Sequence, residues 1–252
     1  MTIQDIYLDS KSTDVSINEE YPLVSKDTCV SSVKTYLGID WGNTLSDTRH
    51  AFEESANESI EFMRRKYCIN ITNSTYKKAS RAARKEIRLF YNGSVERHAW
   101  GAYEKFLLKK LGVSLPEEEY VVLAKQLHNI LLKYLRLKPC AISLLEMARS
   151  KGMKIIIVSN ANSEKLLSEI GVCGVSEFFM AVISSDACGG DKKTGLPFKV
   201  IKEKLGISLK ELLMVGDRDE EDGLIVKYGG DYISGVDLCK VNELLKNLNT
   251  LG

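Results

Sequence analysis

The sequence predicts an α/β protein, a parallel sheet core interrupted by an inserted all-helical segment. Two observations predict this class. After residue 150, short β-branched or Leu-rich runs that end in polar residues alternate with helical patterns, whereas residues 49–137 are almost wholly helical in pattern. Strands that alternate with helices form parallel sheets with right-handed crossovers.

The elements follow in chain order. Residues 1–33 are polar and are expected to form an extension with little core of its own. Helices predicted over 163–172 and 198–207 each carry a glycine near their end, of the kind that often stops a helix. Buried strands are predicted over 36–40, 154–160, 181–186, 212–217 and 231–236.

The helical stretch directly follows the loop after the first strand. We therefore expect a core formed by residues 34–48 and 138–252 and a second small domain over 49–137. Loops of this insertion would face the carboxyl edge of the sheet and could cover it like a lid. In a parallel sheet functional groups gather at that edge, which brings together Asp40, Ser159 and Asp217.

Composition excludes several classes of protein. The chain has 252 residues, 44% hydrophobic and 27% charged, and 35 basic against 34 acidic side chains give a net charge of +1. No global field draws such a protein to nucleic acid or to a membrane surface. No apolar run approaches the ~20 residues of a membrane span. The six cysteines are scattered without a CxxC pair, so we expect reduced thiols in a cytoplasmic protein, with no zinc site and no disulfide framework.

Four short motifs carry the chemistry, each at the end of a strand or in a loop beyond one. Alone, each has a plain structural interpretation: a turn cap, a helix N-cap, a solvated lysine or a solvated acidic loop. They are IDWGNTL at 39–45, VSNAN at 158–162, GGDKKTGLPF at 189–198 and MVGDRDEEDG at 214–223. In this order the chain resembles the haloacid-dehalogenase-like hydrolase superfamily, with a Rossmann-like core and a helical cap, over residues 36 to 240.

The resemblance implies roles for individual residues. Asp40 would be the nucleophile that takes up a phosphoryl group, which splits one difficult step into two. Ser159 would donate a hydrogen bond to a phosphoryl oxygen, and Lys192, rather than its neighbour Lys193, would offset the negative charge. The residues expected to contact the substrate are Thr44, Asn160 and Lys192.

The last motif predicts a metal site. Five acids fall within six positions, at 217 and 219–222, and would repel one another beside Asp40 unless a cation lay among them. Mg²⁺ is the expected ion because it takes oxygen ligands and keeps several waters. Its expected ligands are Asp40, the carbonyl of Gly42, Asp217 and Asp222.

Glycine at position 42 departs from the pattern of the superfamily's phosphatases, which carry there an Asp that protonates the leaving group. A glycine keeps the carbonyl but has no proton to give. General acid–base catalysis contributes roughly 10²–10⁴-fold, so its loss restricts the leaving group.

Three interpretations stay open. DWGNT resembles the first motif of the phosphonatase branch, including Trp41, where a cap lysine such as Lys77 or Lys78 would activate the substrate. Alternatively Asp47, Asp219 or the substrate itself supplies the proton to a slow phosphatase. In the third, a catalytically weak or inactive protein binds a phosphorylated ligand or partner. The dehalogenase branch is disfavoured because it usually has an aromatic residue at position 42 and lacks the paired acids.

The predicted function is therefore a magnesium-dependent hydrolase of a small phosphorylated or phosphonate compound, acting through an aspartyl-phosphate intermediate. One predicted cap helix also carries six positive charges (Lys77, Lys78, Arg81, Arg84, Lys85 and Arg88), of which Arg81, Lys85 and Arg88 share a face. Such a stripe could attract an anion or simply be solvated. The natural substrate and the oligomeric state are left open by the sequence.

Overall fold

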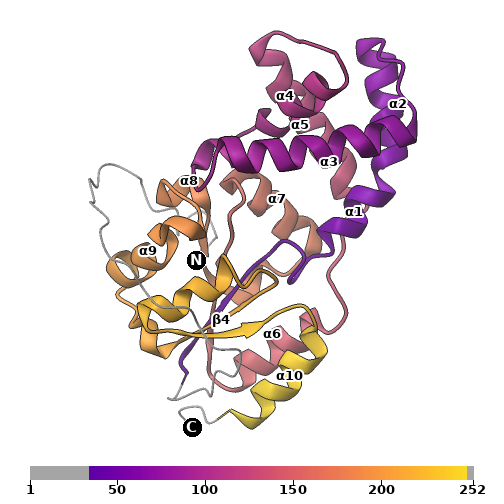
Figure 1. The fold of residues 1–252 in the computed structure, drawn as a ribbon. Helices are drawn as coiled ribbons and strands as arrows, with labels where there is room; N and C mark the ends of the chain where they lie inside the picture. The colour runs from indigo at the N-terminus through magenta and orange to yellow at the C-terminus, as the bar shows by residue number, and fades with distance from the viewer. Residues whose placement is uncertain (1–33, 249–252) are drawn as a thin grey trace.

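The computed structural model describes residues 34–248. The polar extension expected over 1–33 lies outside the described residues. Five strands form one sheet in the order β3-β2-β1-β4-β5, and every neighbouring pair is parallel (Figure 1). This confirms the predicted α/β class. The strands are β1 (Tyr36–Ile39), β2 (Lys154–Val158), β3 (Phe179–Ile183), β4 (Leu212–Gly216) and β5 (Asp231–Ser234).

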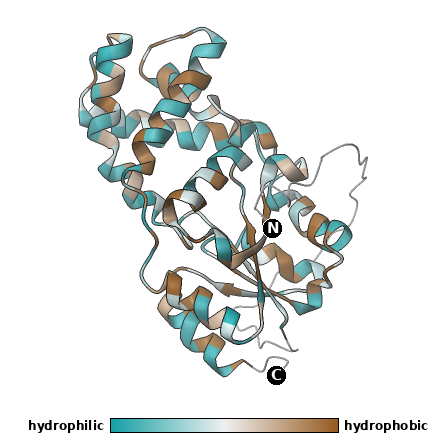
Figure 2. Cartoon of the chain, turned by 180° about the vertical axis from the view of Figure 1, so that it is seen from behind, coloured by the Kyte–Doolittle hydropathy of each residue, from teal (hydrophilic) through white to brown (hydrophobic). Residues whose placement is uncertain are grey.

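Helices cover both faces of the sheet, because successive side chains of a buried strand point to opposite sides. Leu37 and Ile39 pack with α6 (Ala141–Ser150), α7 (Ser163–Cys173) and α10 (Leu238–Asn247). On the other face Ile156 and Met214 pack with α9 (Leu196–Lys204). The strands appear as brown ribbon between helices that are teal on their outer sides (Figure 2).

The chain order places a crevice at the end of β1. From β1 the chain passes to β2 on one side and later returns to β4 on the other. In open α/β sheets ligands bind where the strand order reverses in this way, outside the carboxyl ends of the strands. Asp40, the residue after β1, lies at this point.

The segment between β1 and α6 is helical and has its own apolar cluster, separate from the two beside the sheet. We call it the cap. It lies above the carboxyl edge of the sheet (Figure 1). Its helices are α1 (Thr48–Glu54), α2 (Ala56–Tyr67), α3 (Asn73–Phe90), η2 (Val95–His98), α4 (Ala102–Lys110) and α5 (Glu117–Leu132).

Two chain segments connect the cap to the core, and they run side by side. Ser46 and Leu137 form an antiparallel bridge. The amide of Lys138 donates to the carbonyl of Leu45 at 2.8 Å, and the amide of Asp47 donates to the carbonyl of Arg136 at 2.8 Å. The entry and exit of the cap are thus hydrogen-bonded to each other.

Several element boundaries differ from the sequence prediction by one to three residues, and two of these differences have a local cause. The strand expected over 181–186 is β3, which ends at Ile183, and residues Ser185–Cys188 form the short helix α8. Ser184 donates to Asp186 at 2.7 Å there, a local bond that favours a turn over a strand. Helix α7 passes through Gly171 and ends at Gly174, which adopts φ 66°. Short 3₁₀ segments also occur in the described part of the core: η3 (Ser176–Phe178), η4 (Lys192–Thr194), η5 (Leu209–Glu211) and η6 (Asp222–Tyr228).

The expectation of reduced thiols is wrong for two cysteines. Cys140 and Cys239 form a disulfide, although 99 positions separate them. Each lies at the N-terminal end of a helix, and because α6 and α10 pack side by side, their Cα atoms approach to 5.2 Å. Cys68, Cys173 and Cys188 are free thiols, and Cys29 lies outside the described residues. The cytoplasmic location stays a prediction, and a disulfide is uncommon there.

Membrane insertion through a helix finds no support in the part of the chain that the structure describes. None of its helices combines the length and the apolar character that a bilayer crossing needs.

Candidate active site

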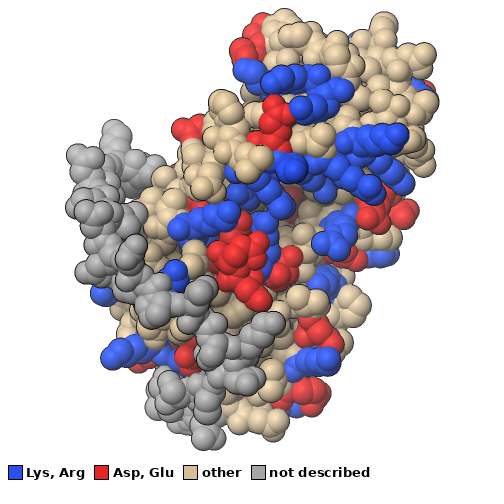
Figure 3. Space-filling view, in the orientation of Figure 1, with Lys and Arg blue, Asp and Glu red and all other residues tan. Residues whose placement is uncertain are grey.

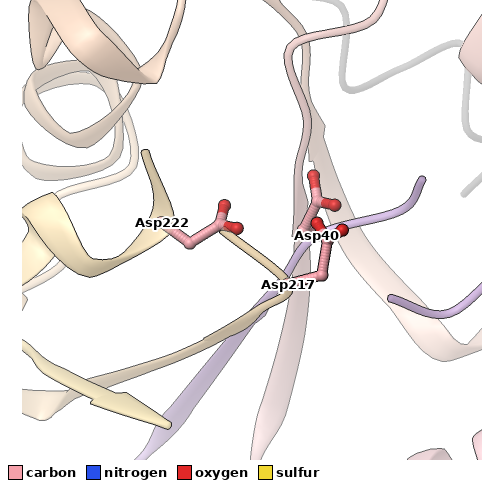
Figure 4. A group of neighbouring side chains, drawn as sticks. All are labelled: Asp40, Asp217 and Asp222. Atoms are coloured by element: carbon pink, nitrogen blue, oxygen red, sulfur yellow. The ribbon is translucent and has the colours of Figure 1, made fainter. Parts of the chain in front are cut away.

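Three aspartates from separate parts of the sequence meet above the sheet. Asp40 follows β1, Asp217 follows β4, and Asp222 opens η6. One carboxylate oxygen of each lies within 4.8 Å of the others. Figure 4 shows the three carboxyl groups turned toward a common point. The structure thus brings together three of the four residues that the sequence analysis expects to hold a metal ion.

A tight turn after β1 orients Asp40. The amides of Leu45 and Ser46 donate to the carbonyl of Trp41 at 3.1 and 2.9 Å. Asn43 adopts φ 60°, a left-handed conformation that asparagine tolerates better than most residues. Trp41 is buried, and its Nε1 donates to Glu169 at 2.7 Å. Trp41 therefore anchors the turn to α7.

Both carboxylate oxygens of Asp40 have partners. Lys192 Nζ lies 2.7 Å from Oδ1, and Thr44 Oγ1 donates to Oδ2 at 3.3 Å. Burial raises the pKa of Asp40, and the ion pair with Lys192 opposes that shift. The carboxylate is thus held by one cation and one hydroxyl.

Lys192, and not its neighbour Lys193, lies in the site. Its ammonium also contacts Asp222 and donates to the carbonyl of Val158 at 3.1 Å. Burial disfavours the ammonium, but Asp40 and Asp222 outweigh burial and raise the pKa of Lys192. Lys193 is exposed.

The loop after β2 supports this arrangement. The Asn160 side chain accepts from the Lys192 amide at 2.8 Å and donates to Glu221 at 2.8 Å. Both ends of this amide are engaged with protein, so a substrate contact by Asn160 would compete with these bonds. Ser159 is buried, and its hydroxyl oxygen accepts from the Ala161 amide at 3.4 Å, which leaves its proton free to be donated. The N-cap of α7 is Asn162 and not Ser159.

Only two of the five acids in the last motif join the aspartate cluster. Tyr232 donates to Asp219 at 2.8 Å. Glu220 lies 3.7 Å from Arg218, and Glu221 pairs with the same guanidinium at 2.7 Å. The mutual repulsion expected of five acids is therefore reduced locally by these partners.

The remaining charge fits a divalent cation. Three carboxylates (Asp40, Asp217 and Asp222) face one ammonium, which leaves an excess of two negative charges when all are ionised. The Oδ1 atom of Asp217 is buried and has no hydrogen-bond partner among the described residues. Such an orphaned oxygen needs a ligand. Hard oxygen donors of this kind suit Mg²⁺.

The pKa values agree with this charge excess. Burial raises the pKa of Asp222 to about 6, although Lys192 pulls it down. Burial and then the neighbouring Asp222 raise the pKa of Asp217. A bound cation would favour the ionised form of both groups.

Gly216 lets Asp222 approach the end of β4. A Cβ atom at position 216 would lie 2.1 Å from Cγ of Asp222. Arg218 donates its amide to Asp222 at 3.0 Å and completes the turn. Position 216 therefore requires glycine, because any larger residue would displace the Asp222 side chain.

Sequence reasoning missed a cap residue that reaches the site. Arg97 of η2 is only 8% exposed and lies 3.4 Å from Asp191 and 3.8 Å from Glu221. These acids precede Lys192 and Asp222 in the chain. Asp191 and Glu221 belong to two of the sequence motifs, but no pattern near position 97 indicated that Arg97 would be their partner.

Comparison with known proteins assigns the family. A family model described as haloacid dehalogenase-like hydrolase matches residues 37–228, which include most of β1, β2 to β4, the cap and all four motifs. The chain belongs to the haloacid dehalogenase-like hydrolase family. This confirms the resemblance that the motifs indicated.

Curated relatives of this hydrolase include phosphatases and a dehalogenase. A phosphoglycolate phosphatase of Aquifex aeolicus is 28% identical over 132 residues, 52% of this chain and 62% of that protein. An (S)-2-haloacid dehalogenase of a Pseudomonas species is 25% identical, covering 58% of this chain and 59% of that protein. A glyceraldehyde 3-phosphate phosphatase of Methanothermobacter thermautotrophicus is 30% identical over 38% of this chain and 42% of that protein. The matches thus span less than two thirds of the length of these relatives.

Solved structures share the fold. The HAD-hydrolase YfnB from Bacillus subtilis, solved bound to magnesium, has a TM-score of 0.65 and 18% identity, covering 86% of this chain and 100% of that one. The L-2-haloacid dehalogenase from Xanthobacter autotrophicus has a TM-score of 0.58 and 22% identity, covering 79% and 76%. These likenesses concern the fold of the hydrolase and not its substrate.

Proposed function

We propose that this protein is a magnesium-dependent hydrolase of a small phosphorylated or phosphonate compound, with Asp40 as the nucleophile. The observation that carries the proposal is the cluster of Asp40, Asp217 and Asp222 around one point, with Lys192 bridging two of them. A carboxylate nucleophile beside a cation site and an ammonium suits attack on a phosphoryl group.

The reaction proceeds in two displacements. An oxygen of Asp40 attacks phosphorus in line, the new phosphorus–oxygen bond forms, and the bond to the leaving group breaks. Water then attacks the aspartyl phosphate and releases inorganic phosphate. Lys192 and the Ser159 hydroxyl stabilise the equatorial oxygens, and Thr44 keeps the carboxylate turned toward the substrate.

Asp40, Asp217, Asp222 and the carbonyl of Gly42 would hold Mg²⁺. The ion supplies charge stabilisation to the transferring phosphoryl group when it is bound. Of these ligands, the three aspartates lie within reach of one ion, and the role of the Gly42 carbonyl follows from the family resemblance.

Gly42 limits which leaving groups depart. The residue has no proton to give, so the proposed hydrolase would act best on aryl or acyl phosphates, whose phenolate or carboxylate leaving groups depart readily without a proton. Asp47 and Asp219 are already engaged: Asp47 caps α1 by accepting from His50, and Asp219 accepts from Tyr232. A phosphonate substrate activated by the cap is the alternative, but Lys77 and Lys78 are exposed on α3.

The decisive experiment restores the acid. A Cβ atom at position 42 would meet only Thr48 Oγ1, at the ordinary contact distance of 3.7 Å, so the backbone has room for a side chain there. We expect Gly42→Asp to raise kcat/KM for alkyl phosphates by about 10²–10⁴-fold and to change that for aryl phosphates little. Steady-state assays with Mg²⁺ over a series of leaving groups of graded pKa measure this.

Asp40→Asn and phosphonoacetaldehyde complete the experiment. Asp40→Asn is expected to abolish turnover in both backgrounds. An Asp40→Asn variant as active as the wild type would refute the nucleophile assignment. No wild-type turnover of aryl phosphate, acyl phosphate or phosphonoacetaldehyde, together with activity in Gly42→Asp, would favour the second candidate, a binding protein for phosphorylated ligands. Borohydride trapping of a covalent adduct would identify the phosphonatase-type route.

A further inference from the structure

One face of cap helix α3 is strongly basic. Arg81, Arg84, Lys85 and Arg88 recur at helical spacing and lie on the same side of the helix. All four are exposed. With Leu89 they line a hollow of about 390 Å³. In Figure 3 a blue band follows α3 and reaches down to a red acidic patch on the core.

These four cations lack acidic partners within residues 34–248, which distinguishes them from most of the cap. Glu86 on the same helix turns away and pairs with Lys109 and Lys110 of α4. Other cap cations also have acids within 4 Å: Arg64 and Arg65 with Glu61, Lys66 with Glu119, Lys105 with Glu117, and Lys133 with Glu58. Many surface cations of this cap are therefore paired, whereas the four on this face of α3 are not. Among the described residues, Lys77 and Lys78 of the same helix also have no acid within 4 Å.

Arg88 is the member of this face that approaches the core. Its pKa is lowered by partial burial and then by Arg218 and Arg97, two cations that flank the aspartate cluster. Arg218 directly follows Asp217, and Arg97 pairs with the residue before Lys192. Arg88 thus lies within electrostatic range of Arg218 and Glu221, which neighbour Asp217 and Asp222 in the chain. Like charges gathered in this way favour an anion between them.

Arg84 is held in place by aromatic rings. Its guanidinium lies 4.7 Å from the centroid of Phe52 and 6.0 Å from that of Tyr103. Stacking restricts the side chain and leaves the edge of the guanidinium able to donate hydrogen bonds. A fixed guanidinium next to a second one is suited to a carboxylate or phosphate oxygen pair.

We propose that Arg84 and Arg88 form a second anion subsite in the cap, and that the substrate carries a carboxylate or second phosphate besides the phosphoryl group taken by Asp40. This inference rests on the proposed function and names its substrate class. One end of the substrate lies at the aspartate cluster, and its other end neutralises the unpaired face of α3. Singly phosphorylated compounds without a further negative charge lack that second contact.

Binding of matched, non-hydrolysable probes tests the subsite apart from turnover. The series is phosphonoacetate, 3-phosphonopropionate and 4-phosphonobutyrate, each against the alkylphosphonate of equal length, with methylenebisphosphonate as the phosphate arm. Isothermal titration in excess Mg²⁺ gives each Kd for the wild type, Arg88→Gln, Arg84→Gln and the control Arg65→Gln. Arg65 is an exposed cap cation of α2 paired with Glu61.

We expect at least one carboxylated probe, or the bisphosphonate, to bind at least about tenfold more tightly than its matched alkylphosphonate. The chain length of the probe that binds best then reports the distance between the two subsites. Arg88→Gln and Arg84→Gln should remove most of that preference while leaving alkylphosphonate binding unchanged, and Arg65→Gln should preserve it. Preference for the carboxylates or for the bisphosphonate identifies the second anion.

Three results would overturn the subsite. Equal affinity for charged and uncharged members of every pair would show that the basic face is only solvated, and would leave the proposed hydrolase intact. A preference that survives in both arginine variants would place the second anion elsewhere. If no probe binds, the subsite is rejected, and turnover of aryl phosphate then decides separately whether the proposed function stands. Comparison of kcat/KM for phosphoglycolate and glyceraldehyde 3-phosphate gives a second readout.

Discussion

At the scale of single residues, buried carboxyl groups set the properties of this protein. Asp40, Asp217 and Asp222 form the candidate active site. Glu169 has a structural role, because it binds the Trp41 side chain next to Asp40. Glu169 accepts from the indole of Trp41 and so fixes the turn that carries Asp40. Its burial raises the pKa to about 7.

Glu169 makes the stability depend on pH. Its pKa is raised by burial in the folded state from the ordinary 4.5 to about 7, so the folded protein holds a proton that the unfolded chain releases. Stability therefore falls as pH rises between these values and is level above them. At about 1.4 kcal/mol per pKa unit the loss is about 3 kcal/mol.

Urea unfolding at pH 5, 6, 7 and 8 measures this effect. Glu169→Gln still accepts the hydrogen bond from Trp41 but does not titrate, so its stability should fall less between pH 5 and 7 than that of the wild type, and the fall that remains comes from other buried acids such as Asp222. Parallel profiles for the two proteins would contradict the protonation of Glu169.

A single methyl group at Gly216 should disturb the metal site. The added Cβ would lie 2.1 Å from Cγ of Asp222, so that carboxylate must move. We expect Gly216→Ala to weaken Mg²⁺ binding, measured by titration calorimetry, by more than about tenfold, since a displaced ligand costs roughly the 10–100-fold typical of altered metal sites. Gly171→Ala is the matched control because its Cβ would meet nothing within 4 Å.

At the scale of elements, packing between helices far apart in sequence carries information that local pattern does not. Helices α6 and α10 lie together on one face of the sheet, and the Cys140–Cys239 bond joins their first turns. Cross-linking of two distant positions removes conformational freedom from the unfolded chain. This bond also ties the exit of the cap to the C-terminal helix.

Removal of the disulfide should lower stability. Cys239→Ser is the preferred variant because Cys140 has a positive φ of 63°. We expect a loss of about 2–4 kcal/mol in the free energy of unfolding, measured by denaturant titration without reductant. Wild type treated with dithiothreitol should match the variant, and Cys68→Ser, a free exposed thiol, should match the wild type. No difference among the four samples would show that the bond does not form in solution.

At the scale of the whole molecule, the cap is seated on the core by polar contacts around the site. Arg97 contacts Asp191 and Glu221, Trp100 donates to Glu164 at 2.7 Å, and His128 lies 2.9 Å from Ser168. Arg97 is the buried member of this set. It bridges the loops that carry Lys192 and Asp222.

Arg97→Met should loosen both loops. Removal of the guanidinium leaves buried Asp191 without its ion pair, which costs about 3–5 kcal/mol when nothing replaces it. We expect faster amide hydrogen exchange over residues 189–195 and 218–222, measured by mass spectrometry, together with lower kcat. Arg65→Met serves as the control. Unchanged exchange in both loops would show that Arg97 does not position them.

The sequence predicted the sheet and the aspartate cluster for the same physical reason. Buried parallel strands read as continuous apolar runs, and the residue that ends each run lies at one edge, as Asp40 and Asp217 do. Asp222 and Lys192 came from their places in the motifs and lie beside Asp40 as expected.

What local pattern could not supply were contacts between distant segments. The Cys140–Cys239 bond depends on how α6 and α10 pack, and the Arg97 ion pairs depend on where the cap lies on the core. The end of α7 was misplaced because Gly171 and Gly174 are equally good helix terminators by sequence, and only the left-handed backbone at Gly174 decides between them.

The bridge between Ser46 and Leu137 has an evolutionary consequence. Since the two segments that lead into and out of the cap are hydrogen-bonded neighbours, the core could close over a short loop in place of the intervening residues. In evolution a different cap could then replace this one between the two segments. Such an exchange would alter substrate recognition and leave the residues at the carboxyl ends of the strands unchanged.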